Sequence, residues 1–488
     1  MTNIDKVIYA RRPPIEYNPI YDVDSYKCSH FYSDSTAMYA SLEARGGAFD
    51  EATLFGLQYT IHAYLTEPVR IGHVTEMQVD MALHGVSFDA AMWQHIVDKY
   101  DGKLPLMVRA IPEGTVVPVG VPVLTVKCTD PVCFPIVGWL EDVFERVWYA
   151  STIAIQSRQF GKAMWKYLSM SSDNPELEFP FKVHDFGARG CATYEQAMLG
   201  GGAHLLSFMG TDTLVGARML KHMYDAGEVG FAGYSIHATE HSMMTSRGRE
   251  GELDVAEEFI IKYLVNRQVP QGAPKLAACV IDSYDYRNFV RAMCSERFQS
   301  LILKSGGTLV LRPDSGKPLE VLPEILNMLE ELLPKGSVTV NTKGFKVLPP
   351  HMRLIQGDGI DLHSMTAILE CLTNLGWSIS NLAFGSGGGL LQKVNRDTQK
   401  WAYKTNALMK DGTWVGISKD PIGDPGKRSK AGLVDTIRKP NGEISWALVP
   451  DGLDFHPDSI MNTVLDHGNI LFHNTLAECR QRIAIARS

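Results

Sequence analysis

The sequence predicts an α/β barrel, closed or open, with its site at one rim. The pattern is clearest at residues 308–316, TLVLRPDSG, where an apolar, β-branched run leads into arginine, proline, aspartate and glycine. We interpret this run as a buried strand, because it is too short for a core helix. Six further stretches mostly repeat the change from apolar segment to polar or glycine tip, with helix-like segments between them: 181–190, 209–214, 233–242, 276–285, 354–361 and 382–389. Strands alternating with helices are typical of a barrel whose ligands bind where the strands end.

The chain has 488 residues, enough for two or three domains. We place a mixed α+β region at 1–180, the barrel-like domain at 181–390, and strands with a last helix at 391–488. Residues 104–127 alternate apolar runs with proline and glycine, as short antiparallel strands do.

Four helix ends can be read from capping residues. The pairs Thr193 with Gln196 and Thr475 with Glu478 fit capping boxes. Asp212 or Thr213 can begin a helix that runs to residue 224, and Gly376 is placed to end a helix at 361–375.

Composition excludes several classes of protein. A hydrophobic content of 45% and a charged content of 21% argue against disorder. The net charge of −8 gives no global reason to expect nucleic-acid binding. The start lacks an apolar signal region, and no apolar run reaches membrane-spanning length. The eight cysteines form no CxxC and no zinc-finger spacing, so we expect reduced thiols in a cytoplasmic protein.

The tips carry residues suited to phosphate and metal chemistry. GSGGG at 385–389 could bring backbone N–H groups close to an anion, or form a plain flexible turn. Several carboxylates at one rim suit Mg²⁺ held with phosphates, or sugar hydroxyls, although any single one could simply cap a helix. These aspartates are Asp185, Asp212, Asp282, Asp314 and Asp358.

Other tip residues have both a functional and a structural interpretation. His241, beside Glu240, is a candidate catalytic residue, although a lone histidine is more often structural. Phe186 could stack on a flat ligand or simply pack. Cations near the tips or in the C-terminal strands could bind phosphate or form a solvated face: Arg189, Arg312, Arg396, Lys404, Lys419, Lys427 and Arg428.

Together these tips resemble the nicotinamide phosphoribosyltransferase family, from about Asp24 to the C-terminal region. The motifs are DSYK, HDFGARG, MGTDT, GYS with ATEHS, DSYD, RPDSG, IQGDG, AFGSGGGLLQK and KDPIGDPGKRSK. The resemblance implies a type II phosphoribosyltransferase fold, in which an irregular α/β barrel-like domain accompanies a mixed α+β domain built from the N- and C-terminal regions. It also implies a homodimer with shared active sites.

The resemblance implies a reaction as well. The phosphoribosyl group of 5-phosphoribosyl 1-diphosphate would pass to nicotinamide, giving nicotinamide mononucleotide and diphosphate in NAD salvage. Mg²⁺ would assist, although its ligands are not assigned. ATP would be a co-substrate, hydrolysed through a phosphohistidine.

Site residues follow from the resemblance motif by motif. His241 would be phosphorylated, with Asp282 near it, and Asp314 with Arg312 would meet the ribose or its phosphates. Phe186 and the partner's Tyr26 would sandwich the pyridine ring, Asp212 would accept its amide N–H, and Arg189 would lie beside the ring and ribose. The other implied binding residues are Ser235, Gly357, Asp358, Gly387 and Gly388, with Arg396, Lys404 and Lys419 from the partner.

Three departures from the family pattern concern the ligand tunnel. Ala188 stands where an aromatic residue is usual, Ala278 replaces a serine, and His237 replaces a proline. The nearest alternative is a nicotinate phosphoribosyltransferase. A sugar-phosphate isomerase or lyase would need a general base or a Schiff-base lysine at a strand end, and no tip offers a lysine. A non-catalytic dimeric binding protein is the third alternative.

Overall fold

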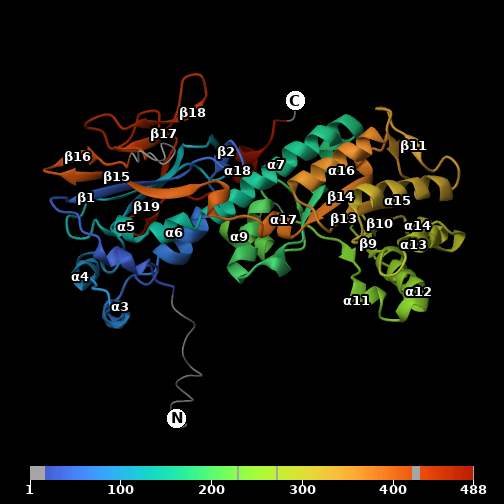
Figure 1. The fold of residues 1–488 in the computed structure, drawn as a ribbon, viewed down its shortest axis with the longest axis horizontal. Coiled ribbons are helices and arrows are strands. Elements are labelled where there is room, and N and C mark those ends of the chain that lie inside the picture. The colour runs from blue at the N-terminus through green and yellow to red at the C-terminus, as the bar shows by residue number, and fades with distance from the viewer. Residues whose placement is uncertain (1–16, 228–229, 271–272, 420–428, 487–488) are drawn as a thin grey trace, which may run out of the picture. The chain divides into compact units, whose positions relative to one another are not determined.

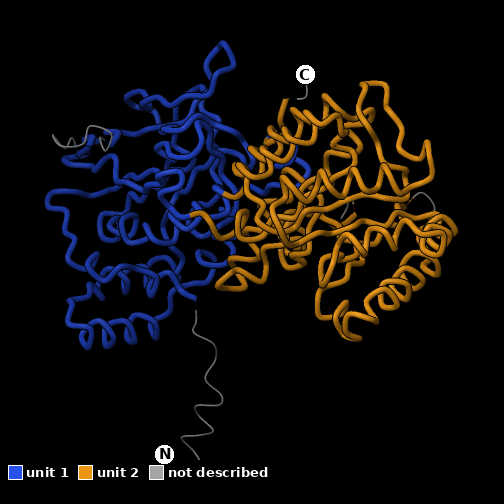
Figure 2. The backbone as a smooth tube through the Cα atoms, turned by 45° about the vertical axis from the view of Figure 1, so that its right-hand side comes forward, with its two compact units in different colours: residues 1–152, 395–482 blue, residues 153–394, 483–488 orange. Residues whose placement is uncertain are grey.

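The computed structural model describes residues 17–227, 230–270, 273–419 and 429–486. The chain forms two compact units (Figure 2). Unit 1 comprises residues 1–152 and 395–482, and unit 2 comprises residues 153–394 and 483–488. Among the described helices, none combines the length and the apolar character that crossing a bilayer requires.

The compact units change at residue 152, whereas the sequence analysis places a domain boundary at residue 180. Helix α7 (Trp148–Ser171) is continuous, and the chain passes from unit 1 to unit 2 within it. Gln156 on this helix donates to the carbonyls of Gly389 and Leu390, at 3.1 and 2.9 Å. The helix does not end at the boundary between the units, so the sequence has no helix-breaking residue that would mark this boundary.

Unit 1 is built on an antiparallel sheet that joins the two ends of the chain. Its strand order is β16-β15-β1-β5-β3-β19-β20. Strand β1 (Ala37–Ala44) pairs with β15 (Trp401–Lys410) and with β5 (Pro122–Cys128). The remaining strands are β3 (Met107–Ala110), β16 (Thr413–Gly416), β19 (Asn462–Asp466) and β20 (Asn469–Ile470). The second α+β domain expected from both termini is confirmed.

Helices α3 (Ile71–His84) and α4 (Ala90–Tyr100) contribute Val74, Met77 and Ile96 to the core of unit 1. The capping box at Thr475 is confirmed. The Thr475 hydroxyl accepts the Glu478 N–H at 3.3 Å, and Glu478 Oε2 accepts the Thr475 N–H at 3.0 Å. Helix α18 (Leu476–Ile483) begins there.

Unit 2 contains the predicted barrel-like sheet, whose seven strands correspond to the seven tips. Its order is β7-β6-β14-β13-β10-β9-β8, and all of its pairs are parallel. The strands are β6 (Val183–Asp185), β7 (Gly210–Thr211), β8 (His237–Ala238), β9 (Leu276–Val280), β10 (Thr308–Arg312), β13 (Met352–Gln356) and β14 (Leu382–Ser386).

One segment connects both edges of this sheet. Tyr234 bridges Gly210 of β7, and three residues later His237 pairs with Ala277 of β9. The sheet is therefore curled, with its two edge strands held by the same stretch of chain. This curling brings the ends of all seven strands to one rim.

Helices connect the strands of unit 2, and α15 and α16 pack side by side along the sheet (Figure 1). Their bounds are α9 (Tyr194–His204), α10 (Leu214–Met223), α11 (His241–Met244), α12 (Gly248–Ile260), α13 (Tyr286–Met293), α14 (Glu296–Ser305), α15 (Pro318–Leu332), α16 (Leu362–Asn374) and α17 (Gly388–Leu391). Thr193 caps α9 through the Gln196 N–H, and Gly376, with φ +79°, follows α16 as predicted. Helix α10 begins after Thr213 and ends before Tyr224, as predicted, although no described side chain accepts a hydrogen bond at its first turn.

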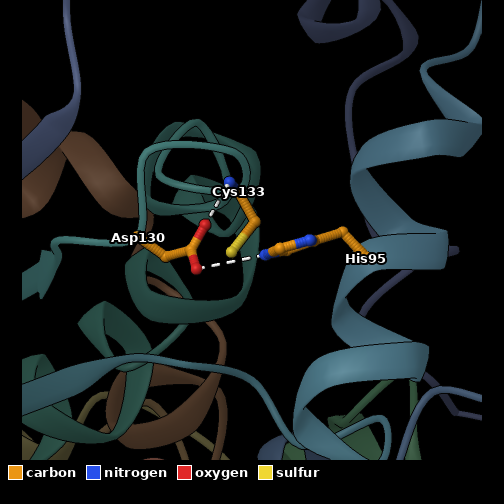
Figure 3. A group of neighbouring side chains, drawn as sticks. All are labelled: His95, Asp130 and Cys133. Atoms are coloured by element: carbon orange, nitrogen blue, oxygen red, sulfur yellow. Dashed lines mark hydrogen bonds and ion pairs between the residues drawn. The ribbon is translucent and has the colours of Figure 1, made fainter.

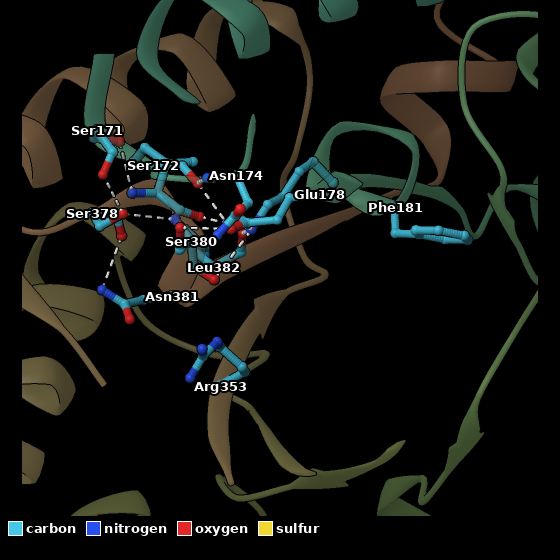
Figure 4. Close-up of polar contacts among 12 residues, drawn as sticks. Ser171, Ser172, Asn174, Glu178, Phe181, Arg353, Ser378, Ser380, Asn381 and Leu382 are labelled. Carbon is cyan, nitrogen blue, oxygen red and sulfur yellow. Dashed lines mark hydrogen bonds and ion pairs between the residues drawn. The ribbon is translucent and has the colours of Figure 1, made fainter. Parts of the chain in front are cut away.

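The amino end of the barrel is filled by a polar network (Figure 4). Buried Lys182 donates to the carbonyls of Ile379, Ser380 and Leu382, at 2.9 to 3.2 Å, and pairs with Glu178 at 3.1 Å. Glu178 also accepts hydrogen bonds from the hydroxyls of Ser172 and Ser380. Burial lowers the pKa of Lys182. These contacts satisfy the lysine, so we interpret this end of the barrel as structural.

Buried His204 should make the protein sensitive to acid. Its Nδ1 lies 3.0 Å from the Ser157 hydroxyl and its Nε2 lies 3.2 Å from the Val183 carbonyl, and burial lowers its pKa to about 4. The unfolded chain binds the proton near pH 6.5, so the free energy of unfolding should fall by up to about 3 kcal/mol between about pH 6.5 and pH 4. Urea unfolding of His204→Gln should show a weaker fall, whereas exposed His363→Gln should behave like the wild type. Equal pH dependence in all three would contradict this assignment.

Candidate active site at the carboxyl edge of the barrel

Because the seven strands of unit 2 are parallel, the residues that follow them meet at one rim. The structure places there Phe186 after β6, Asp212 after β7, His241 after β8, Asp282 after β9, Asp314 after β10, Gly357 after β13 and Gly387 after β14. The prediction that these tips share one edge of the sheet is confirmed. Their chemical roles remain predictions.

His241 and Asp282 form a hydrogen-bonded pair. Nε2 of His241 lies 3.1 Å from Oδ1 of Asp282. The side chain of Asp282 is 2% exposed, whereas that of His241 is 48% exposed. The other oxygen of Asp282 accepts the main-chain N–H of Asp314 at 3.0 Å. A buried carboxylate therefore orients an accessible imidazole and also holds the tip of the next strand.

Arg312 and Asp314 provide opposite charges beside this pair. Arg312 Nε lies 3.4 Å from Asp314 Oδ2, but this buried N–H has no hydrogen-bond partner among the described residues. A buried guanidinium N–H without an acceptor fits a site that receives an anion. Burial raises the pKa of the Asp314 carboxyl, and Arg312 opposes that rise.

Phe186 lies over two glycines of neighbouring strands. A Cβ atom on Gly385 would come 2.0 Å from the ring of Phe186, and one on Gly357 would come 3.4 Å from it. The ring packs against Ala278, Val310 and Ile355 on one face of the sheet. Gly385 is therefore needed because the ring occupies the space of a side chain.

Gly385→Ala should displace the Phe186 ring. A contact of 2.0 Å is impossible, so the ring must turn out of its position. If this ring holds the substrate base, KM for nicotinamide should rise about tenfold while the free energy of unfolding falls by about 1–3 kcal/mol. Gly72→Ala is the control, because a Cβ there meets no atom within 4 Å. Unchanged KM in Gly385→Ala would contradict a role for this ring in binding.

Asp212 and Ser235 meet across two neighbouring segments. The Ser235 hydroxyl donates to Oδ1 of Asp212, and the Asp212 main-chain N–H donates to the Asp185 carbonyl at 2.9 Å. Asp212 is exposed, so its carboxylate can accept a further donor from a ligand. Arg189, in the short helix η4 (Ala188–Gly190), is also exposed.

The GSGGG loop meets the rim at its middle glycines. A Cβ on Gly389 would strike the Ile360 carbonyl at 2.3 Å, whereas one on Gly388 would meet only Gln392, at 3.6 Å. The space beside Gly388 is thus open, as a backbone phosphate cradle requires. Asp358, after β13, is exposed and raises the pKa of Asp314 by charge repulsion.

The remaining predicted residues belong to unit 1. Tyr26 is 57% exposed, on the short helix η1 (Ser25–Ser29). Lys404 and Lys419 line a cavity of about 410 Å³ together with Lys27. Arg396 lies 3.5 Å from Glu145. Their contribution to a shared site stays a prediction, and Lys427 and Arg428 lie outside the described residues.

A separate group in unit 1, His95, Asp130 and Cys133, has the composition of a metal site (Figure 3). However, Asp130 Oδ2 already accepts from Lys99 Nζ and the Tyr100 hydroxyl, each at 2.7 Å. The interaction with the Cys128 thiol, together with burial, also raises the pKa of Cys133, which keeps its thiol protonated and a poor ligand. An ammonium group therefore occupies the position of a cation, and we assign no metal to this group.

Comparison with known proteins shows the family of the chain. The nicotinate phosphoribosyltransferase family model matches residues 181–446, and the model of the nicotinamide phosphoribosyltransferase N-terminal domain matches residues 18–108. A nicotinamide phosphoribosyltransferase of Xanthomonas campestris is 40% identical over 476 residues, which cover 96% of this chain and 99% of that protein. The chain belongs to the nicotinamide phosphoribosyltransferase family.

Two further comparisons agree with this family. A nicotinamide phosphoribosyltransferase of Acinetobacter baylyi is 29% identical, with 96% of this chain and 97% of that protein covered. The solved nicotinate-nucleotide pyrophosphorylase of Pyrococcus furiosus has a TM-score of 0.56 at 14% identity, covering 99% of this chain and 96% of that chain. The structural likeness concerns the fold, and the expected type II phosphoribosyltransferase fold is confirmed.

The departures from the family pattern fall at different places. Ala278 lies in the apolar cluster beneath Phe186, so it affects the lining of the barrel directly. Ala188 is exposed, and the His237 ring packs 4.2 Å from that of Tyr263. Sequence reasoning missed the roles of Gly385 and Gly357 under the ring. In the sequence, the two positions are marked only as glycines that follow apolar strand residues. The register of the sheet is needed to show that both lie against Phe186.

Proposed function

We propose that this chain transfers the phosphoribosyl group of 5-phosphoribosyl 1-diphosphate to nicotinamide, giving nicotinamide mononucleotide and diphosphate in NAD salvage. The observation that carries the proposal is the contact chain from His241 through Asp282 to Asp314. Beside it lies the buried Nε–H of Arg312, which has no hydrogen-bond acceptor among the described residues. These residues lie at the same rim as Phe186 and Asp212, which supports one common site for the base and the phosphates. The relatives named above support the choice of reaction.

The residues suit the charges that this reaction develops. Departure of diphosphate leaves positive charge at the ribose anomeric carbon and negative charge on the leaving group. Arg312 would stabilise the leaving group, and Asp314 would face the ribose. The pyridine nitrogen is already nucleophilic, so the chain needs to orient the base rather than activate it.

Phe186 and Asp212 would hold the base. The aromatic ring offers a stacking surface, and the Asp212 carboxylate accepts the amide N–H of nicotinamide. Arg189 would lie beside the ring, and Ser235 fixes the carboxylate. A carboxylate at this position repels nicotinate, which argues against the alternative function, a nicotinate phosphoribosyltransferase.

The rim also suits Mg²⁺ bound together with phosphates. Asp314 and Asp358 follow the neighbouring strands β10 and β13, and the charge of Asp358 adds to burial in raising the pKa of Asp314, so a cation beside both carboxylates would be favourable. These two residues would hold the ion, which would neutralise charge on the diphosphate.

ATP would act through His241. Because Nε2 faces Asp282, Nδ1 is the ring nitrogen left to accept the phosphoryl group. We also propose a cytoplasmic homodimer with shared active sites, in which Tyr26, Arg396, Lys404 and Lys419 serve the partner's site. The free thiol state of all eight cysteines supports a reducing compartment.

The test is diphosphate release by the purified full chain with nicotinamide and with nicotinate, each with and without ATP. ATP-stimulated turnover of nicotinamide is the expected result. No release with either base would overturn the proposal, and a preference for nicotinate would favour the alternative. Sedimentation at several protein concentrations tests the dimer.

A further inference from the structure

Asp185 is a buried carboxylate that connects the two groups proposed to hold the base. It is the last residue of β6 and is 0% exposed. Its Oδ1 accepts the main-chain N–H of Gly187 at 2.7 Å, and its main-chain carbonyl accepts the N–H of Asp212 at 2.9 Å. Phe186 lies between Asp185 and Gly187 in the sequence. Asp185 therefore holds the backbone next to both Phe186 and Asp212, the two residues proposed to bind the base.

The bond to Gly187 defines the turn that carries Phe186. A side-chain oxygen that accepts the N–H two residues later forms an Asx turn, which fixes the backbone of the residue between. The Phe186 N–H is held as well, by the Ser386 carbonyl at 2.9 Å. Gly187 cannot shift toward the neighbouring helix, because even a Cβ there would come 2.6 Å from Leu391.

The second carboxylate oxygen of Asp185 is buried, and the side chain of Thr213 lowers the pKa of this carboxyl. It lies beside Gly201 of α9 and faces the start of α10 at Thr213, and the charge of Asp212 lies nearby. Burial raises the pKa of Asp185 to about 6.

We propose that Asp185 is a positioning residue for base binding, which sets the angle of the Phe186 ring through the Gly187 N–H. It does not touch the substrate. The inference rests on the proposed function, because it assumes that Phe186 and Asp212 hold the pyridine base.

KM for nicotinamide in variants of Asp185 should depend on how well the new side chain accepts the hydrogen bond from the Gly187 N–H. In Asp185→Ala the turn loses its acceptor, so KM for nicotinamide should rise about fivefold to tenfold, with KM for the sugar diphosphate within about twofold of wild type. Asp185→Asn keeps an oxygen in the same place and should restore KM to within about twofold, while Asp185→Ser should lie between, since hydroxyls form such turns more weakly. If the alanine variant does not fold, serine and asparagine carry the comparison.

The matched control is Asp130→Ala in unit 1. Asp130 Oδ1 accepts the Val132 N–H at 2.8 Å, which is the same kind of turn, and Asp130 is also buried. This variant should lose stability without a change in KM for nicotinamide. Wild-type KM in both Asp185→Ala and Asp185→Ser would overturn the inference alone. A wild type inactive with nicotinamide would overturn the proposed function and the inference with it.

Discussion

Replacing Asp212 with asparagine is expected to remove most of the discrimination between nicotinamide and nicotinate. The exposed Asp212 carboxylate accepts an amide N–H but repels a second carboxylate, and like charges in contact cost several kcal/mol. The wild type should therefore prefer nicotinamide by about 10²–10³ in kcat/KM. In Asp212→Asn, kcat/KM for nicotinamide should fall about tenfold, because a charged acceptor becomes neutral, while that for nicotinate should rise.

The measurement is kcat/KM for both bases with saturating sugar diphosphate. Ser235→Ala is the matched comparison, since it removes the hydroxyl that fixes Asp212 and leaves the charge in place. It should bind nicotinamide more weakly yet keep the preference. Equal use of both bases by the wild type would show that Asp212 does not select the substrate.

His241→Ala is expected to abolish ATP hydrolysis and to leave only a slow reaction that ATP does not accelerate. In the wild type the imidazole is accessible and Asp282 orients it from a buried position. Loss of a group that carries the phosphoryl transfer should lower the ATPase rate by about 10²–10⁴. Asp282→Asn should give a smaller loss, because the imidazole remains but its orienting charge is gone.

Two measurements check the His241 prediction. Labelled ATP should leave an acid-labile, base-stable phosphate on the wild type and none on His241→Ala. The control His363→Gln changes an exposed histidine on α16 and should keep both phosphorylation and stimulation by ATP. Full ATPase activity in His241→Ala would place the phosphate elsewhere.

Much of the rim could be predicted because its signals are local in sequence. Apolar runs that end in RPDSG, IQGDG or AFGSGGG each indicate where a strand stops, and parallel strands bring their ends together. The structure adds what depends on register. Gly385 and Phe186 are 199 positions apart by their numbering, yet the ring fills the space above that glycine.

Other features had no readable signal. The sequence shows Asp185 only as one of five aspartates at strand ends, because an aspartate in an Asx turn and one that binds a metal look the same in a sequence. The change of unit at residue 152 also lacks a local signal, since residues 148–160 of α7 on either side of it include no glycine or proline. Long-range packing of a continuous helix, not local propensity, decides that division.

The segment from Tyr234 to His241 pairs with both edges of the curled sheet, at Gly210 of β7 and at Ala277 of β9. Two residues of the proposed site lie in this segment, six positions apart. Ser235 donates a hydrogen bond to Asp212, and His241 lies beside Asp282. A ligand that displaces Ser235 would therefore also move the segment that carries the His241 imidazole. If the base binds at Phe186 and Asp212 and His241 is phosphorylated, as proposed, the two events would therefore be coupled through this short segment of backbone.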